Sequence, residues 1–173
     1  MKYTMSVQAL KQWRNAVLMM ACFWLVACTD PLHLYQPLDV TRAGQTARFD
    51  FNIPKKGDYR FALLFYTGSG LIEMNRRFAV FGEQNEKGIV LPVSLVIVKD
   101  GHVFFDKQIK STGTGWTQHI KYEGKEINTA VRNLDVLTLP PGNYQATVTM
   151  LSDTPEFNDI LSFFDVDFFN PKI

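Results

Sequence analysis

The sequence predicts an all-β fold: a single β-sandwich, of immunoglobulin-like or jelly-roll type, with about seven to nine strands and at most one short helix. Three observations support this. Apolar and polar residues alternate with a period of two in several short segments. Turn-forming residues separate these segments at short intervals. The chain also contains 14 Phe and 6 Tyr, which suit the half-buried surface of a pleated sheet.

Residues 46–53 show the clearest alternation, because every second side chain is apolar: Ala47, Phe49, Phe51 and Ile53. Further strands are expected at 59–66, 92–98, 102–109, 134–139, 144–151 and within 160–169. Asp100-Gly101 lies between two of these segments and is typical of a two-residue hairpin turn. Only residues 125–134 show apolar residues at helical spacing, so a short helix is expected there.

Two tyrosines follow turns that contain proline and glycine. Tyr59 comes after Pro54-Lys55-Lys56-Gly57-Asp58, and Tyr144 comes after Pro140-Pro141-Gly142-Asn143. Sandwich domains often fix a corner with a tyrosine at the start of a strand. We therefore expect both tyrosines to have structural roles.

The N-terminus is typical of a secretory signal. Basic residues Lys2, Lys11 and Arg14 precede an apolar run over residues 16–27, and the first acidic residue is Asp30. The run is 12 residues long, whereas a helix needs about 20 apolar residues to cross a bilayer. A signal-peptide helix is therefore favoured over a transmembrane anchor.

The end of this run, Leu25-Val26-Ala27-Cys28, resembles the lipobox of bacterial lipoproteins. The resemblance implies cleavage after Ala27 and covalent lipid on the Cys28 thiol, with no other cofactor. The alternative is an ordinary signal peptide cut at an A-x-A-like site, but Leu25 occupies the place of the first small residue. The expected organisation is therefore a lipoprotein signal peptide (1–27), a lipidated tether (28–36) and a sandwich domain (37–173).

The residue after Cys28 bears on localisation. By resemblance to enteric lipoproteins, in which Asp at this position retains the protein in the inner membrane, Thr29 favours the periplasmic face of the outer membrane. Asp30, one place later, leaves the inner membrane as the alternative.

Removal of residues 1–27 leaves 15 basic and 17 acidic residues. This near-neutral balance argues against a nucleic-acid partner. It also leaves Cys28 as the only cysteine of residues 28–173, so no disulfide is expected within them.

No combination of residues indicates an enzyme or a metal site. Ser69 lies between two glycines, but the G-x-S-x-G pattern of serine hydrolases is incomplete. The histidines His33, His102 and His119 are scattered and lack metal-ligand spacing. Asp165 and Asp167 fall on one strand face, where simple exposure to solvent explains them.

One segment favours ligand binding. Residues 112–119 are polar and rich in glycine, and they include Trp116, the only tryptophan after residue 27. With His119 and Tyr122 nearby, we interpret this segment as a loop that presents aromatic side chains to a sugar or a peptide. The alternative is that Trp116 packs back onto the core.

Together with residues 49–59, 92–95, 98–101, 139–144 and 170–173, these features resemble an uncharacterised family of proteobacterial lipoproteins with a domain of unknown function. The resemblance implies a location and a fold but no catalytic residues. We expect a lipid-anchored, non-enzymatic binding module in the periplasm, whose partner is a toxin, if it is an immunity protein, or an envelope protein. The alternatives are a carbohydrate- or peptidoglycan-binding module and a periplasmic hydrolase.

Overall fold

The computed structural model describes residues 31–83 and 86–170. Residues 31–173 form one compact unit. Its elements, in chain order, are β1 (His33–Pro37), β2 (Thr46–Ile53), β3 (Gly57–Tyr66), α2 (Leu71–Phe81), β4 (Leu91–Lys99), β5 (His102–Ser111), β6 (Trp116–Tyr122), β7 (Lys125–Leu139), β8 (Gly142–Met150), a 3-10 turn η1 (Pro155–Phe157) and β9 (Ser162–Phe168).

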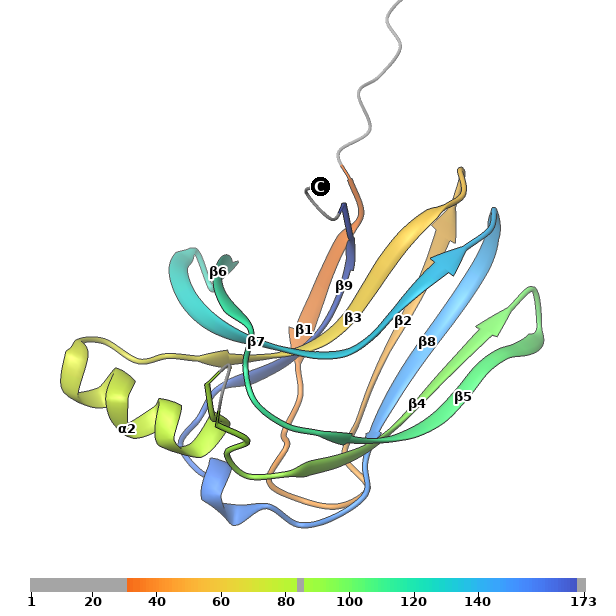
Figure 1. The fold of residues 1–173 in the computed structure, drawn as a ribbon. Helices are drawn as coiled ribbons and strands as arrows, with labels where there is room; N and C mark the ends of the chain where they lie inside the picture. Colours follow the sequence, from red (N-terminus) through yellow and green to blue (C-terminus); the bar gives the residue numbers. More distant parts are fainter. Residues whose placement is uncertain (1–30, 84–85, 171–173) are drawn as a thin grey trace, which may run out of the picture. The chain divides into compact units, whose positions relative to one another are not determined.

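The strands form two antiparallel sheets, of order β1-β9-β3-β7-β6 and β2-β8-β4-β5 (Figure 1). The predicted all-β sandwich with one short helix is confirmed. In the described part of the chain, no helix combines the length and the hydropathy needed to cross a bilayer.

The main core lies between the two sheets and is built largely from aromatic and branched side chains. It includes Phe61, Phe65, Leu95, Ile97, Val148, Phe157 and Phe164, all essentially inaccessible to solvent. In β2, Ala47 and Ile53 are buried and Phe49 and Phe51 are partly buried, which confirms the predicted alternation. Burial of this apolar surface is the main favourable contribution to folding.

The turn chemistry was predicted well. Asp100 and Gly101 both have positive φ (48° and 83°), as the expected hairpin turn between β4 and β5 requires. The Tyr144 hydroxyl donates a hydrogen bond to the carbonyl of Pro140 at 2.7 Å and fixes the β7–β8 corner. Tyr59 is 5% exposed and packs edge-on against Phe168.

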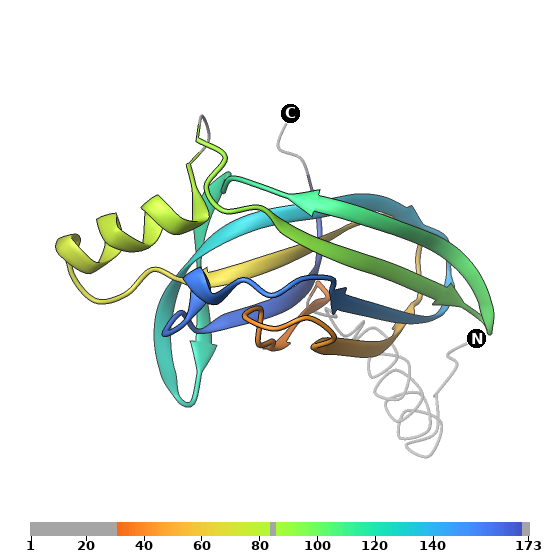
Figure 2. The same cartoon turned by 90° about the horizontal axis from the view of Figure 1, so that it is seen from below.

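The helix was predicted in the wrong place. Residues 125–134 belong to the strand β7, and the helix α2 spans residues 71–81 instead. Strand β7 pairs with β3 on one side and β6 on the other, and its residues 129–132 are buried on both faces of the sheet. Apolar residues on both faces remove the alternation that identifies a strand. Helix α2 projects from the sandwich beside the end of β3 (Figure 1 and Figure 2).

The sandwich also begins earlier than expected. Residues 33–36 were assigned to the tether, but they lie in β1, which pairs with β9. The lipobox and Cys28 lie outside the described residues.

A buried arginine joins several loops of the sandwich. Arg132 is fully buried, and no acidic residue forms an ion pair with it in the described part of the chain. Its guanidinium donates to the carbonyls of Gly113 (3.0 Å) and Ile89 (3.0 Å), and also to that of Phe81. Burial lowers the Arg132 pKa to about 10, so the group remains charged at neutral pH.

Several turns lie close to the start of β1 at one end of the sandwich. We call this the entry end, because the chain enters the domain there. His33 at the start of β1 pairs with Asp167 near the end of β9. The β2–β3, β4–β5 and β7–β8 turns (residues 54–56, 100–101 and 140–141) lie at the same end, as the registers of the antiparallel pairs require (Figure 1). The start of α2 and residues 112–115 lie toward the opposite, distal end.

Candidate functional site: a buried polar network under a curled sheet

The five-stranded sheet carries side chains on two covered faces. Along β9, Phe164 and Val166 face the main core, whereas Phe163 belongs to a second apolar cluster on the outer face of the sheet. Asp165 and Asp167 share the face of Phe163, because side chains alternate along a strand. This second cluster also contains Ala62, Leu64, Ile120 and Val131.

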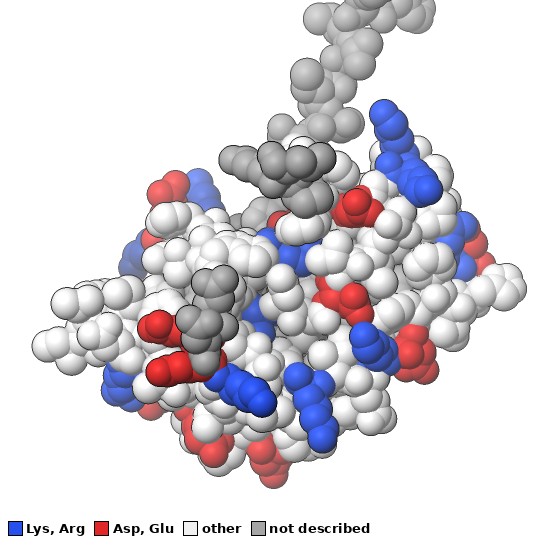
Figure 3. All heavy atoms as spheres, viewed as in Figure 1, with Lys and Arg blue, Asp and Glu red and all other residues white. Residues whose placement is uncertain are grey.

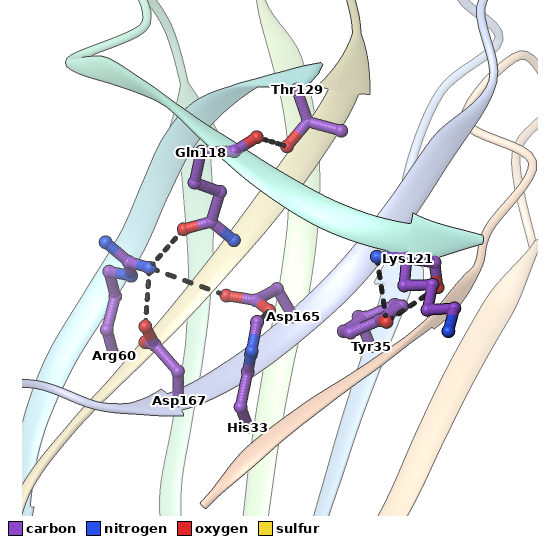
Figure 4. Close-up of polar contacts among 8 residues, drawn as sticks. All are labelled: His33, Tyr35, Arg60, Gln118, Lys121, Thr129, Asp165 and Asp167. Carbon is purple, nitrogen blue, oxygen red and sulfur yellow. Dashed lines mark hydrogen bonds and ion pairs between the residues drawn. The ribbon is translucent and has the colours of Figure 1, made fainter. Parts of the chain in front are cut away.

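The sheet curls until its two edge strands meet over this outer face. The Tyr35 hydroxyl on β1 donates to the Lys121 carbonyl on β6 at 2.7 Å and accepts from the Lys121 amide at 3.3 Å (Figure 4). Tyr122 packs edge-on against Phe163 with the ring centroids 5.1 Å apart. The β6–β7 hairpin therefore covers a face that would otherwise be open to solvent.

Polar side chains from four strands converge beside this second cluster (Figure 4). The Arg60 Nη2 atom donates to Asp167 Oδ2 at 2.6 Å and to Gln118 Oε1 at 2.8 Å. It lies 3.7 Å from Asp165 Oδ2. The Nε2 atom of His33 lies 3.0 Å from Asp165 Oδ1. We call Arg60, Asp165, Asp167, His33 and Gln118 the polar network.

Burial sets the charge state of the network. The Asp165 side chain is completely buried, and those of Arg60 and Asp167 are 5% and 20% exposed. Burial, reinforced by the negative charge of Asp165, raises the pKa of Asp167 to about 6. The hydrogen bond to Asp165 raises the pKa of His33 above its ordinary value. The network can therefore take up protons near neutral pH.

Several buried atoms of the network have no hydrogen-bond partner. They are Arg60 Nε, Gln118 Nε2, Asp165 Oδ2 and Asp167 Oδ1. Buried polar atoms normally have a partner, so these donors and acceptors have capacity for a water molecule or another small polar group. In the described part of the chain, no set of three His, Cys, Asp or Glu side chains is arranged to hold a metal ion.

Two of the three residues predicted to bind a ligand lie beside this network. Residues 116–122 form strand β6, so the predicted loop is confined to residues 112–115. Trp116 is 40% exposed, and its ring lies 4.7 Å from the Arg60 guanidinium carbon. Trp116 and Tyr122 share the covered face of β6, whereas His119 points to the opposite face and is exposed. The structure therefore separates His119 from the other two.

Other sequence expectations also change. Asp165 was interpreted as an exposed strand residue, which is wrong because the β6–β7 hairpin and β1 cover that face. Ser69 lies just before α2 and is exposed, and its amide donates to Glu73 at 2.9 Å. Arg60, His33 and Gln118 were not predicted to be site residues. A charged residue inside the apolar segment 59–66 was the available signal for Arg60.

Comparison with known proteins identifies a family and a fold. A family model described as a domain of unknown function (DUF5625) matches residues 35–168. None of the curated proteins matches the sequence.

Two solved structures were found to be similar to this chain. One, from Sulfurospirillum deleyianum, has a TM-score of 0.63 at 15% identity and covers 82% of this chain and 99% of its own. At this identity the likeness concerns the fold alone. A family 35 carbohydrate binding module from Clostridium thermocellum has a TM-score of 0.35 at 14% identity, with 79% and 91% covered. That similarity is too low to bear on function.

Proposed function

The chain belongs to the DUF5625 family, a domain of unknown function, and from its own residues we propose that it is a lipid-anchored, non-enzymatic binding module of the bacterial envelope. One observation carries this proposal: the compact unit begins at Pro31, three residues after the lipobox cysteine. Cleavage after Ala27 would therefore remove nothing from the described fold. Lipid on Cys28 would hold the domain at the periplasmic face of the outer membrane, since two or more acyl chains give stable anchoring.

The polar network supports a role without catalysis. Its charged groups neutralise one another, because Arg60 contacts both carboxylates and His33 contacts Asp165. A general acid or base needs a reactive partner within hydrogen-bond reach. In the described structure, the groups that Asp165 and Asp167 reach are basic side chains.

Labelling with a fatty-acid analogue tests the anchor. The unaltered chain should incorporate the label and fractionate with membranes. Cys28→Ser should do neither, whereas Cys22→Ser is the matched control and should behave like the unaltered chain. Label on the Cys28→Ser chain would exclude the proposed anchor.

The specific form that we propose is an immunity lipoprotein that neutralises a toxin delivered into the periplasm. Residues 28–173 contain a small, near-neutral domain, and a lipid anchor would hold it at the membrane, where it could bind a protein that enters the periplasm. Deletion of the gene should sensitise cells to a toxin-producing neighbour, and the toxin should co-purify with the lipoprotein. Unchanged survival of the deletion strain beside such neighbours would count against this form.

A carbohydrate- or peptidoglycan-binding role is the second candidate, because Trp116 is 40% exposed and shares a strand face with Tyr122. Glycan fragments that stack on this ring would change its fluorescence. Trp116 is the only tryptophan of residues 28–173, so the signal has a single source. Unchanged emission at saturating glycan would exclude stacking at this residue.

A further inference from the structure

The entry end of the sandwich carries exposed basic and apolar side chains. Lys55 and Lys56 are exposed in the β2–β3 turn. Val103 (67% exposed) and Phe104 (42%) lie near the tip of the β4–β5 hairpin, and Phe168 (41%) lies at the end of β9. Figure 3 shows basic side chains at the tip that Figure 1 assigns to the β2–β3 turn.

The acidic side chains among these turns are already engaged. Asp100 forms an ion pair with Lys99 at 2.6 Å and accepts the Asn143 amide at 3.0 Å. Asp58 accepts a hydrogen bond from the Thr138 hydroxyl. Lys55 and Lys56 form no ion pair within the described part of the chain. Lys55, Lys56 and Lys99 therefore stand against two carboxylates, Asp58 and Asp100. These turns have an excess of one positive charge, although residues 28–173 carry two more acidic than basic residues.

The chain enters the domain at this same end. Pro31 precedes β1 and lies three positions after Cys28 in the sequence. A fully extended chain spans at most about 3.6 Å per residue, so Pro31 lies within about 11 Å of Cys28. Lipid on Cys28 would therefore hold the entry end close to the lipid headgroups.

We propose that the entry end is a membrane-contacting surface for anionic phospholipid, a proposal that extends the lipid anchor proposed above. Lys55 and Lys56 contact the lipid phosphates, and Val103 and Phe104 reach the interfacial region. The anchor then fixes an orientation as well as a location. The distal end, with α2, faces away from the bilayer and remains accessible to a partner.

Binding to vesicles tests this surface without the lipid anchor. Residues 31–173 contain both apolar clusters, so chain 28–173 with Cys28→Ser folds as its own unit. Its partition into vesicles of equal parts phosphatidylcholine and phosphatidylglycerol is compared with that into pure phosphatidylcholine, at low ionic strength. Each lysine at an anionic surface contributes about fivefold to binding. Lys55→Gln with Lys56→Gln should therefore weaken partition about 25-fold.

Lys87→Gln with Lys110→Gln is the matched control. Both lysines are exposed near the distal end, and the double substitution changes the net charge by the same amount. Partition of this control should stay within about twofold of the parent. Equal losses in the two double variants, or no preference of the parent for phosphatidylglycerol, would overturn the proposal. Because the assay uses unlipidated protein, its result is independent of whether Cys28 is lipidated in cells.

Discussion

Replacing Arg60 with methionine is a direct perturbation of the polar network. Arg60 is 4% exposed and Asp165 is fully buried. The substitution keeps an unbranched apolar side chain in place but leaves two carboxylates with only His33 as a basic neighbour in the network. Removing one partner of a buried ion pair costs about 3–5 kcal/mol. We expect the free energy of unfolding at neutral pH to fall by about that amount.

Urea unfolding followed by Trp116 fluorescence measures this change, since no other tryptophan occurs in residues 28–173. Adding Asp165→Asn and Asp167→Asn to Arg60→Met removes the uncompensated charge and should recover most of the loss. Protonation should recover it too, so the penalty should shrink as the pH is lowered toward 4. A loss below about 1 kcal/mol, or a loss that neither the asparagines nor acid reduces, would refute the assignment of this cost to buried charge.

Three further substitutions test other parts of the fold. The pKa of Asp167 is raised from 3.8 to about 6, so ionisation of this carboxyl lowers the free energy of unfolding by about 3 kcal/mol as the pH rises between these two values. Urea unfolding midpoints measured between pH 4 and pH 6 should show that Asp167→Asn removes this decline. The raised pKa of His33 gives stability that is fully present below about pH 6.5 and is lost as the pH rises through the folded pKa, and His33→Gln should flatten that part of the same profile. Arg132→Met leaves the buried carbonyl of Phe81 and the partly buried carbonyls of Ile89 and Gly113 without this donor. An unsatisfied buried group costs about 1–3 kcal/mol, so thermal unfolding should show a loss of about 3 kcal/mol, with Arg132→Lys intermediate. An Arg132→Met chain as stable as the parent would mean that these carbonyls find other donors.

The strands of the four-stranded sheet were predictable because one face meets solvent and the other meets the core. In β2, this arrangement produces the visible alternation from Ala47 to Ile53. The first part of β7, where a helix was expected over residues 125–134, was not recognised as a strand because residues 129–132 are covered on both faces. Its last residues, 134–139, were predicted as a strand. Helix α2 was missed because Leu71 and Ile72, its first two residues, are exposed at 67% and 89% and do not continue a buried stripe.

The polar network was harder to predict, since its contacts join residues far apart in the chain. His33 and Asp165 are 132 positions apart, and Arg60 and Asp167 are 107 apart. Their proximity depends on the register of β3, β9 and β1, which local patterns do not determine. The burial of Asp165 depends further on the curling of β6 toward β1. An alternating Asp-Val-Asp segment looks the same whether its polar face is open or covered.

The mass of the N-terminal peptide, measured on protein extracted from the membranes of its own bacterium, tests the central claim most directly. We predict a chain that begins at Cys28 and carries diacylglycerol on the thiol, with or without a further acyl group on the amino terminus. A chain that begins at another residue, or one in which Cys28 keeps a free thiol, would contradict the account.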